Sequence, residues 1–272
     1  MVEHSFNTQQ QSVLNLDLKT HIFLEGPFKS GKTALALARL REYAINSDPT
    51  HQVLVLIPQQ TLSLPYRHCI QNPDFPAGVL PTIITLAGLA RKFITLNWAQ
   101  VMEEYGFHKL DQPAAFLNME TAQYFLKQIC QPFLDKGYFL EIHINQARLF
   151  SQILDTMNKA ALVGYPLTET ADRLKDAWKG EAIRQSHYEQ AQECALAFRR
   201  FCLENNLLDF SLQIEIFRDA MADIESHQKE SFFQNFQFLI ADNLEEDVPV
   251  LHDLILSLNK EIPSMLLIKD QN

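Results

Sequence analysis

The sequence predicts an α/β protein with a parallel sheet, because short apolar runs alternate with helix-forming segments at both ends of the chain. Three such runs lie at 21–25, 52–57 and 81–85, and helix formers fill the segment Lys32–Asn46 between the first two. Two more runs lie at 238–241 and 264–268, on either side of an expected helix at 248–258. A short helix is expected at 6–16, before the first strand.

The middle of the chain has a different pattern. From 98 to 205 the sequence is helical in character throughout, with clear segments at 114–133, 145–161 and 186–203. We therefore expect one sheet domain formed by 1–97 plus 206–272. The segment 98–205 is expected to be a large helical insertion into that domain.

The composition is that of a globular protein, with 47% hydrophobic and 21% charged residues. No apolar run approaches the roughly 18 residues that a membrane span needs, and the polar N-terminus has no apolar segment typical of a secretory signal. We expect no membrane association and a cytoplasmic location. The four cysteines form no C-x-x-C pair, which favours reduced and packed thiols over a zinc site.

The formal net charge is −10, and it is unevenly distributed. Acids far outnumber bases from Asn206 onward, whereas the two balance over the first fifty residues. A nucleic-acid-binding surface usually has a basic footprint, and the chain as a whole has none. Any contact with DNA is therefore expected to be local, or shared with parts outside these residues.

The strongest motif is a complete G-x-x-x-x-G-K-[ST] between an expected strand and an expected helix. Such a loop turns backbone N–H groups toward phosphate oxygens, and the helix that follows presents its positive end. Its lysine reaches the β- and γ-phosphates, and its threonine binds Mg²⁺. The motif predicts binding of ATP with Mg²⁺, and its residues are Gly26, Pro27, Phe28, Lys29, Ser30, Gly31, Lys32 and Thr33.

A nucleotide site of this kind needs a second acid to hold the metal. Asp242 directly follows the expected strand 238–241, which makes it the candidate partner of Thr33 at the metal. A lone aspartate after a strand is also common as a helix cap or turn residue, so this assignment depends on the glycine-rich motif.

These motifs and several weaker ones, in the same order, resemble the UvrD/Rep-type superfamily I DNA helicases and their AddB/RecC relatives. Phe6-Asn7-Thr8-Gln9-Gln10 looks like the family's L-N-x-x-Q segment, which makes Gln10 the implied reader of adenine. Residues 53–58 with Arg67 resemble motif Ia, and 82–93 resemble a segment that helps to contact single-stranded DNA. Leu208-Asp209-Phe210 resembles a D-F-x-D-L element, and 238–249 resembles motif II. The resemblance implies a RecA-like fold with ATP and DNA as ligands, and a helical subdomain of the 1B type.

Two departures from the family pattern concern hydrolysis. Asn243 stands where the family has the catalytic glutamate of motif II, and an amide is a far weaker base than a carboxylate. Glu245 and Glu246 are the carboxylates nearby that remain as substitutes. The sequence also stops where motif III is expected, so the resemblance implies a truncated ATP-binding portion, completed by a C-terminal helicase half or a nuclease partner.

Three functions follow from these observations. The first is the ATP-binding portion of a DNA helicase or repair translocase, with impaired hydrolysis. The second is a non-catalytic, scaffold-like subunit of a helicase–nuclease, which Asn243 favours. The third is a small-molecule P-loop kinase, which the long helical insertion and the Asp209-Phe210 element argue against.

Overall fold

The computed structural model describes residues 6–46, 52–76, 80–109, 111–140, 144–180, 183–222 and 227–271. The chain divides into two compact units, one formed by 1–89 with 220–272 and the other by 90–219. The sequence-based boundaries at 98 and 205 both fall inside the second unit.

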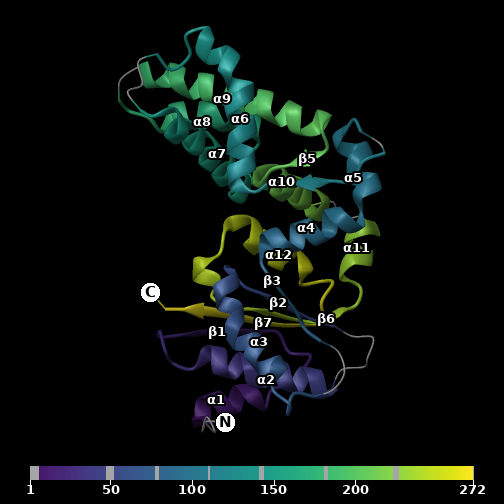
Figure 1. The fold of residues 1–272 in the computed structure, drawn as a ribbon. Coiled ribbons are helices and arrows are strands. Elements are labelled where there is room, and N and C mark those ends of the chain that lie inside the picture. Colours follow the sequence, from purple (N-terminus) through teal and green to yellow (C-terminus); the bar gives the residue numbers. More distant parts are fainter. Residues whose placement is uncertain are drawn as a thin grey trace. The chain divides into compact units, whose positions relative to one another are not determined.

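The first unit contains a five-stranded sheet in which every neighbouring pair of strands is parallel. The strand order is β1-β7-β6-β2-β3 (Figure 1). This confirms an α/β protein with a parallel sheet, and each expected strand is present within one or two residues of its expected bounds. The strands are β1 (Ile22–Gly26), β2 (Gln52–Leu56), β3 (Thr82–Ile84), β6 (Phe236–Ala241) and β7 (Ser264–Asp270).

Helices cover both faces of this sheet (Figure 1). On one side lie α1 (Thr8–Leu14), α2 (Lys32–Asn46) and α3 (Leu64–Gln71), and on the other lies α12 (Pro249–Leu258). The ring of Tyr43 on α2 stacks on Phe238 of β6 with centroids 4.1 Å apart, at the centre of the apolar core. Burying each large apolar side chain of this core contributes about 1.5–3 kcal/mol. The remaining elements of the unit are η1 (Gln60–Ser63), α11 (His227–Phe233) and η3 (Leu244–Glu246).

The second unit is mainly helical, as expected. Its longer helices are α6 (Met119–Asp135), α7 (Gln146–Leu162), α9 (Ile183–Glu204) and α10 (Phe210–Ala222), of which α10 runs on into the first unit. The other elements are α4 (Leu86–Leu96), which begins in the first unit, α5 (Trp98–Tyr105), η2 (Leu167–Glu169) and α8 (Thr170–Ala177).

One helix of the second unit begins later than expected. The sequence predicts a helix from 114, but α6 begins at Met119, because the Asn118 side chain accepts a hydrogen bond from the Thr121 N–H and caps the helix there. The residues before the cap form the short strand β4 (Ala115–Phe116), which pairs with β5 (Leu207–Leu208). A two-residue strand has too few residues for an alternating pattern, so the sequence did not predict it.

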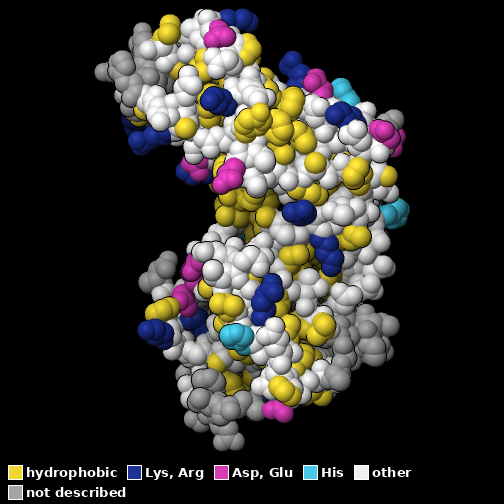
Figure 2. Space-filling model, in the orientation of Figure 1, with side chains coloured by type: hydrophobic (Ala, Val, Ile, Leu, Met, Phe, Trp, Pro, Cys, Tyr) yellow, Lys and Arg dark blue, Asp and Glu magenta, His cyan; other side chains and the backbone are white. Residues whose placement is uncertain are grey.

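The visible surface has mixed charge. Figure 2 shows Lys and Arg side chains scattered singly over this face, among acids and apolar side chains, and not gathered into one basic patch. Within the described ranges, no helix is long and apolar enough to cross a membrane.

Candidate functional site

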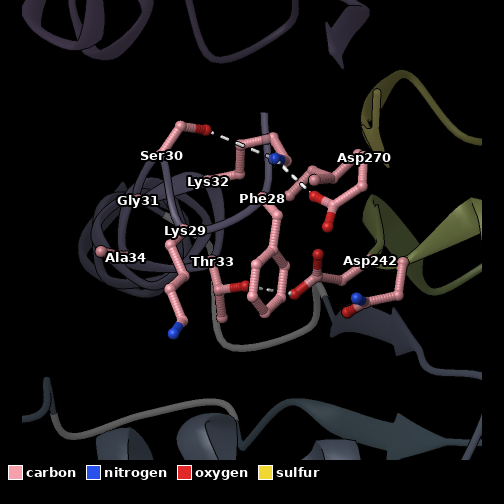
Figure 3. A pocket seen from close by; sticks show the side chains of 11 residues that line it. Phe28, Lys29, Ser30, Gly31, Lys32, Thr33, Ala34, Asp242 and Asp270 are labelled. Atoms are coloured by element: carbon pink, nitrogen blue, oxygen red, sulfur yellow. Dashed lines mark hydrogen bonds and ion pairs between the residues drawn. The ribbon is translucent and has the colours of Figure 1, made fainter. Parts of the chain in front are cut away.

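The candidate residues meet at the carboxyl edge of the sheet. The loop 26–33 connects β1 to α2, Asp242 follows β6, and Asp270 ends β7, which lies between those two strands. In a parallel sheet the carboxyl ends of the strands share one edge, and ligands bind there. A cavity of about 350 Å³ opens at this edge (Figure 3). Its lining consists of residues 28–34 with Asp242, Asn243, Ile268 and Asp270.

The 26–33 loop has the conformation of a concave turn. Lys29 has φ 60° and Gly31 has φ 84°, both in the left-handed region. Glycine suits this positive φ, at which an L side chain would be strained. A Cβ atom on Gly31 would also lie 2.9 Å from Nε2 of Gln10, so the end of the Gln10 side chain would have to shift. Alternation of right- and left-handed residues directs successive N–H groups into one concavity. The first-turn N–H groups of α2, which have no acceptor within the helix, open onto the same place.

Lys32 is the cation of the cavity, with a side chain that is only 8% exposed. Its Nζ donates to the carbonyl oxygens of Gly26 at 2.8 Å and Pro27 at 2.7 Å, and lies 3.3 Å from Ser30 Oγ. The same Nζ lies 2.5 Å from Oδ1 of Asp270 (Figure 3). The ammonium group is therefore held over the loop by neutral oxygens and one carboxylate.

Thr33 and Asp242, the pair that the sequence assigns to a metal, lie in direct contact. The Thr33 hydroxyl donates to Asp242 Oδ2 at 3.1 Å (Figure 3). The Tyr66 hydroxyl on α3 donates to the same oxygen at 2.8 Å, and both Tyr66 and Asp242 are buried. Burial raises the pKa of the Asp242 carboxyl above its ordinary value, while the hydrogen bonds from Tyr66 and Thr33 act in the opposite direction.

These oxygens fit a magnesium ion that is mainly held by a nucleotide. Mg²⁺ commonly takes one or two protein oxygens and completes its shell with phosphate and water. Thr33 Oγ1 and Asp242 Oδ2 are such a pair of hard ligands. Among the residues with described positions, no group of three or more His, Cys, Asp or Glu side chains forms a metal site of its own. The four cysteines are buried and form no disulfide.

Asn243 lines the cavity in an unusual backbone conformation, with φ 63° and ψ 45°. Asparagine tolerates this left-handed region better than glutamate does. Its Nδ2 lies 3.4 Å from Glu245 Oε1. Glu245 also accepts from the backbone N–H of Asp270 at 2.9 Å, and Glu246 accepts from Gln59. Neither glutamate is among the residues that line the cavity, so Asp242 and Asp270 are its lining carboxylates.

Gln10 lies behind the loop, at a second cavity of about 180 Å³. Its Nε2 donates to the Ser30 carbonyl at 2.9 Å, and its Oε1 accepts from the N–H of Asn7. The Asn7 side chain in turn accepts from the Gln10 N–H, which completes a capping box at the start of α1. The amide of Gln10 thus supports the loop and the helix start, and both of its polar atoms have partners within the chain.

Phe28 is a large apolar residue of the loop that is 73% exposed. The Lys29 ammonium lies 5.3 Å from the centre of that ring. An exposed aromatic ring at the mouth of a polar cavity offers an apolar surface against which a planar group of a ligand can pack.

Two residues of the site were not predicted as part of it, Tyr66 and Asp270. Asp270 follows an expected strand, and the shared carboxyl edge was the signal that could have placed it beside Lys32. Tyr66 precedes Arg67 in the segment that resembles motif Ia. Its contact with Asp242 depends on how α3 packs on the sheet, for which the sequence contains no local signal. Arg67 itself is exposed and donates to Ser63.

Comparison of the chain with protein-family models gave no match, and comparison with curated proteins gave none either. The chemistry of the cavity is therefore the basis on which a function is inferred.

Proposed function

We propose that this chain binds ATP with Mg²⁺ in the cavity at the carboxyl edge of its sheet. The observation that carries the proposal is the position of Lys32, which lies nearly buried above a concave loop at the start of α2, next to the Thr33–Asp242 pair. The loop supplies N–H groups and the lysine supplies a positive charge for phosphate oxygens. Thr33 and Asp242 supply the protein oxygens for the metal. On this proposal the first unit is a P-loop domain of the RecA-like type, and the helical unit 90–219 is its insertion.

The wider role that fits this site is the ATP-binding portion of a superfamily I DNA helicase-like protein, acting in DNA repair or recombination. The order of the motifs along the chain supports this role, with single-stranded or double-stranded DNA and a helicase half or nuclease as partners. Bound ATP is expected to turn over slowly. A water molecule beside the γ-phosphate needs a carboxylate to align it, and Asn243 offers an amide.

A second candidate is a non-catalytic, scaffold-like subunit that retains nucleotide binding. The observation that favours it is the left-handed backbone at Asn243. Glutamate at that position would cost about 1–2 kcal/mol of backbone strain, so the local conformation suits the residue that is present. Phosphate release distinguishes the two candidates, because only the first predicts turnover that depends on Lys32.

The test of nucleotide binding is equilibrium titration with a fluorescent ATP analogue in the presence of Mg²⁺. Lys32→Ala removes a charge-assisted contact to phosphate that is worth about 1.5–3 kcal/mol. The dissociation constant should therefore rise by roughly 10–150-fold. Lys19→Ala removes the same charge from an exposed position of the same unit and should bind as the parent does. Equal affinity of Lys32→Ala and the parent would show that the site is wrongly assigned.

A further inference from the structure

The ion pair between Lys32 and Asp270 has a consequence for nucleotide binding. Asp270 is held in place from two directions. In the sheet its backbone lies opposite Gly26 of β1, and the N–H of Gln271 donates to the Gly26 carbonyl at 2.9 Å. Its own N–H donates to Glu245 Oε2 at 2.9 Å. The backbone of Asp270 is therefore held in place, and its carboxylate reaches Lys32 from there.

The contacts of Lys32 leave its ammonium group without a spare hydrogen. An ammonium has three N–H donors, and Nζ already lies within hydrogen-bond distance of four oxygens in this structure. Three of these oxygens are neutral, and the fourth belongs to the Asp270 carboxylate at 2.5 Å. The side chain of Asp270 is only 22% exposed, so water screens the pair weakly.

A phosphate oxygen that binds Lys32 must take the place of one of these four oxygens. The carboxylate is the contact that competes with phosphate, because it is an anion and would repel a phosphate oxygen bound to the same small cation. The Asp270 side chain also lines the cavity, where it points toward the end of the Lys32 side chain (Figure 3). Its carboxylate therefore pairs with the same ammonium group that a phosphate in this cavity would need.

We infer that Asp270 is an internal competitor of phosphate for Lys32, and that it sets the nucleotide affinity of this site. The inference rests on the proposed nucleotide binding. In the closed arrangement seen here Lys32 is paired with Asp270, and in the open arrangement it is available to phosphate. The observed dissociation constant equals the intrinsic one divided by the open fraction, so the ion pair weakens binding.

Asp270→Asn tests this inference directly. The amide has the same shape and can still accept a hydrogen bond, but it carries no charge, so the closed arrangement loses its main attraction. We expect the fluorescent ATP analogue with Mg²⁺ to bind about tenfold more tightly than to the parent, which corresponds to about 1.4 kcal/mol. Asp270→Ser, which removes the carboxylate in a different way, should also tighten binding.

The matched control is Asp253→Asn on the exposed side of α12, which makes the same change of net charge. It should leave the affinity of the parent unchanged. Far-ultraviolet circular dichroism of each variant checks that the fold is kept.

The outcomes separate this inference from the proposed function. If Asp270→Asn binds the analogue with the affinity of the parent or more weakly, Asp270 is not a competitor, while the nucleotide site stands. An equal gain with Asp253→Asn would mean that net charge alone sets the affinity, and would also overturn the inference. If neither the parent nor Asp270→Asn binds, or if Lys32→Ala binds as the parent does, the proposed function fails and the inference fails with it.

Discussion

Tyr66→Phe removes one hydroxyl group from the buried side of the site, and its effect can be worked out from the structure. The lost hydrogen bond is the 2.8 Å contact to Asp242 Oδ2, which leaves Thr33 as the side-chain donor to that oxygen. A hydrogen bond to a charged group contributes about 1.5–3 kcal/mol. At roughly 3 °C per kcal/mol, the variant should unfold about 5–10 °C below the parent at pH 8.

The pH dependence of this loss gives the prediction a sign. Burial raises the pKa of the Asp242 carboxyl. The folded state therefore loses stability as the pH rises above the ordinary pKa of aspartate and this carboxyl ionises. The Tyr66 hydroxyl reduces that cost because it donates to the ionised form. Without the hydroxyl the pKa rises further, so the difference between variant and parent should be larger at pH 8 than at pH 5.

The assay is thermal unfolding of the parent and the variant at both pH values, followed by circular dichroism. Tyr105→Phe is the matched control, because the Tyr105 hydroxyl donates at 3.2 Å to Asp219, whose side chain is 42% exposed. Its loss should be below about 1 kcal/mol. A Tyr66→Phe protein as stable as the parent at pH 8, or one more strongly destabilised at pH 5, would refute the reasoning.

Two further variants test the segment that follows β6. Asn243→Glu introduces a carboxylate, so it should raise Lys32-dependent phosphate release modestly. Its backbone strain of about 1–2 kcal/mol should lower the melting temperature. An unchanged release rate together with an unchanged melting temperature would contradict both expectations. Asp247→Asn acts on a carboxyl whose pKa is raised to about 7 by burial and by the neighbouring Glu245 and Glu246. The parent therefore loses stability between about pH 4 and 7 as this group ionises. The free energy of unfolding of the variant should exceed that of the parent by about 1 kcal/mol at pH 8 but not at pH 4. An equal gain at both pH values would argue against titration of this group.

Much of the sheet unit followed from local sequence patterns. The helix Lys32–Asn46 has the expected bounds, because it begins directly after the glycine-rich motif and is filled with helix formers. The inner strands β2, β6 and β7 were recognisable as apolar runs because strands inside a parallel sheet are buried on both faces. The strand pair β4–β5 was missed, since each strand has only two residues.

The site was only partly predictable, for a physical reason. The meeting of Thr33 and Asp242 follows from the shared carboxyl edge of parallel strands, once both strands are recognised. The same edge could have placed Asp270 near Lys32, whereas the hydrogen bond from Tyr66 depends on how α3 packs on the sheet. The left-handed backbone of Asn243 depends on the turn into η3. The presence of asparagine in place of glutamate does not by itself reveal that conformation.

The most direct test of the central claim is a crystal structure of the chain with Mg²⁺ and a non-hydrolysable ATP analogue. We expect the phosphates against the N–H groups of the 26–33 loop, with Lys32 Nζ about 2.7–2.9 Å from a phosphate oxygen and separated from Asp270. The metal should lie between the phosphates and the Thr33–Asp242 pair. A nucleotide bound elsewhere, or a cavity without nucleotide in which Lys32 keeps its contact with Asp270 at saturating analogue, would contradict the account.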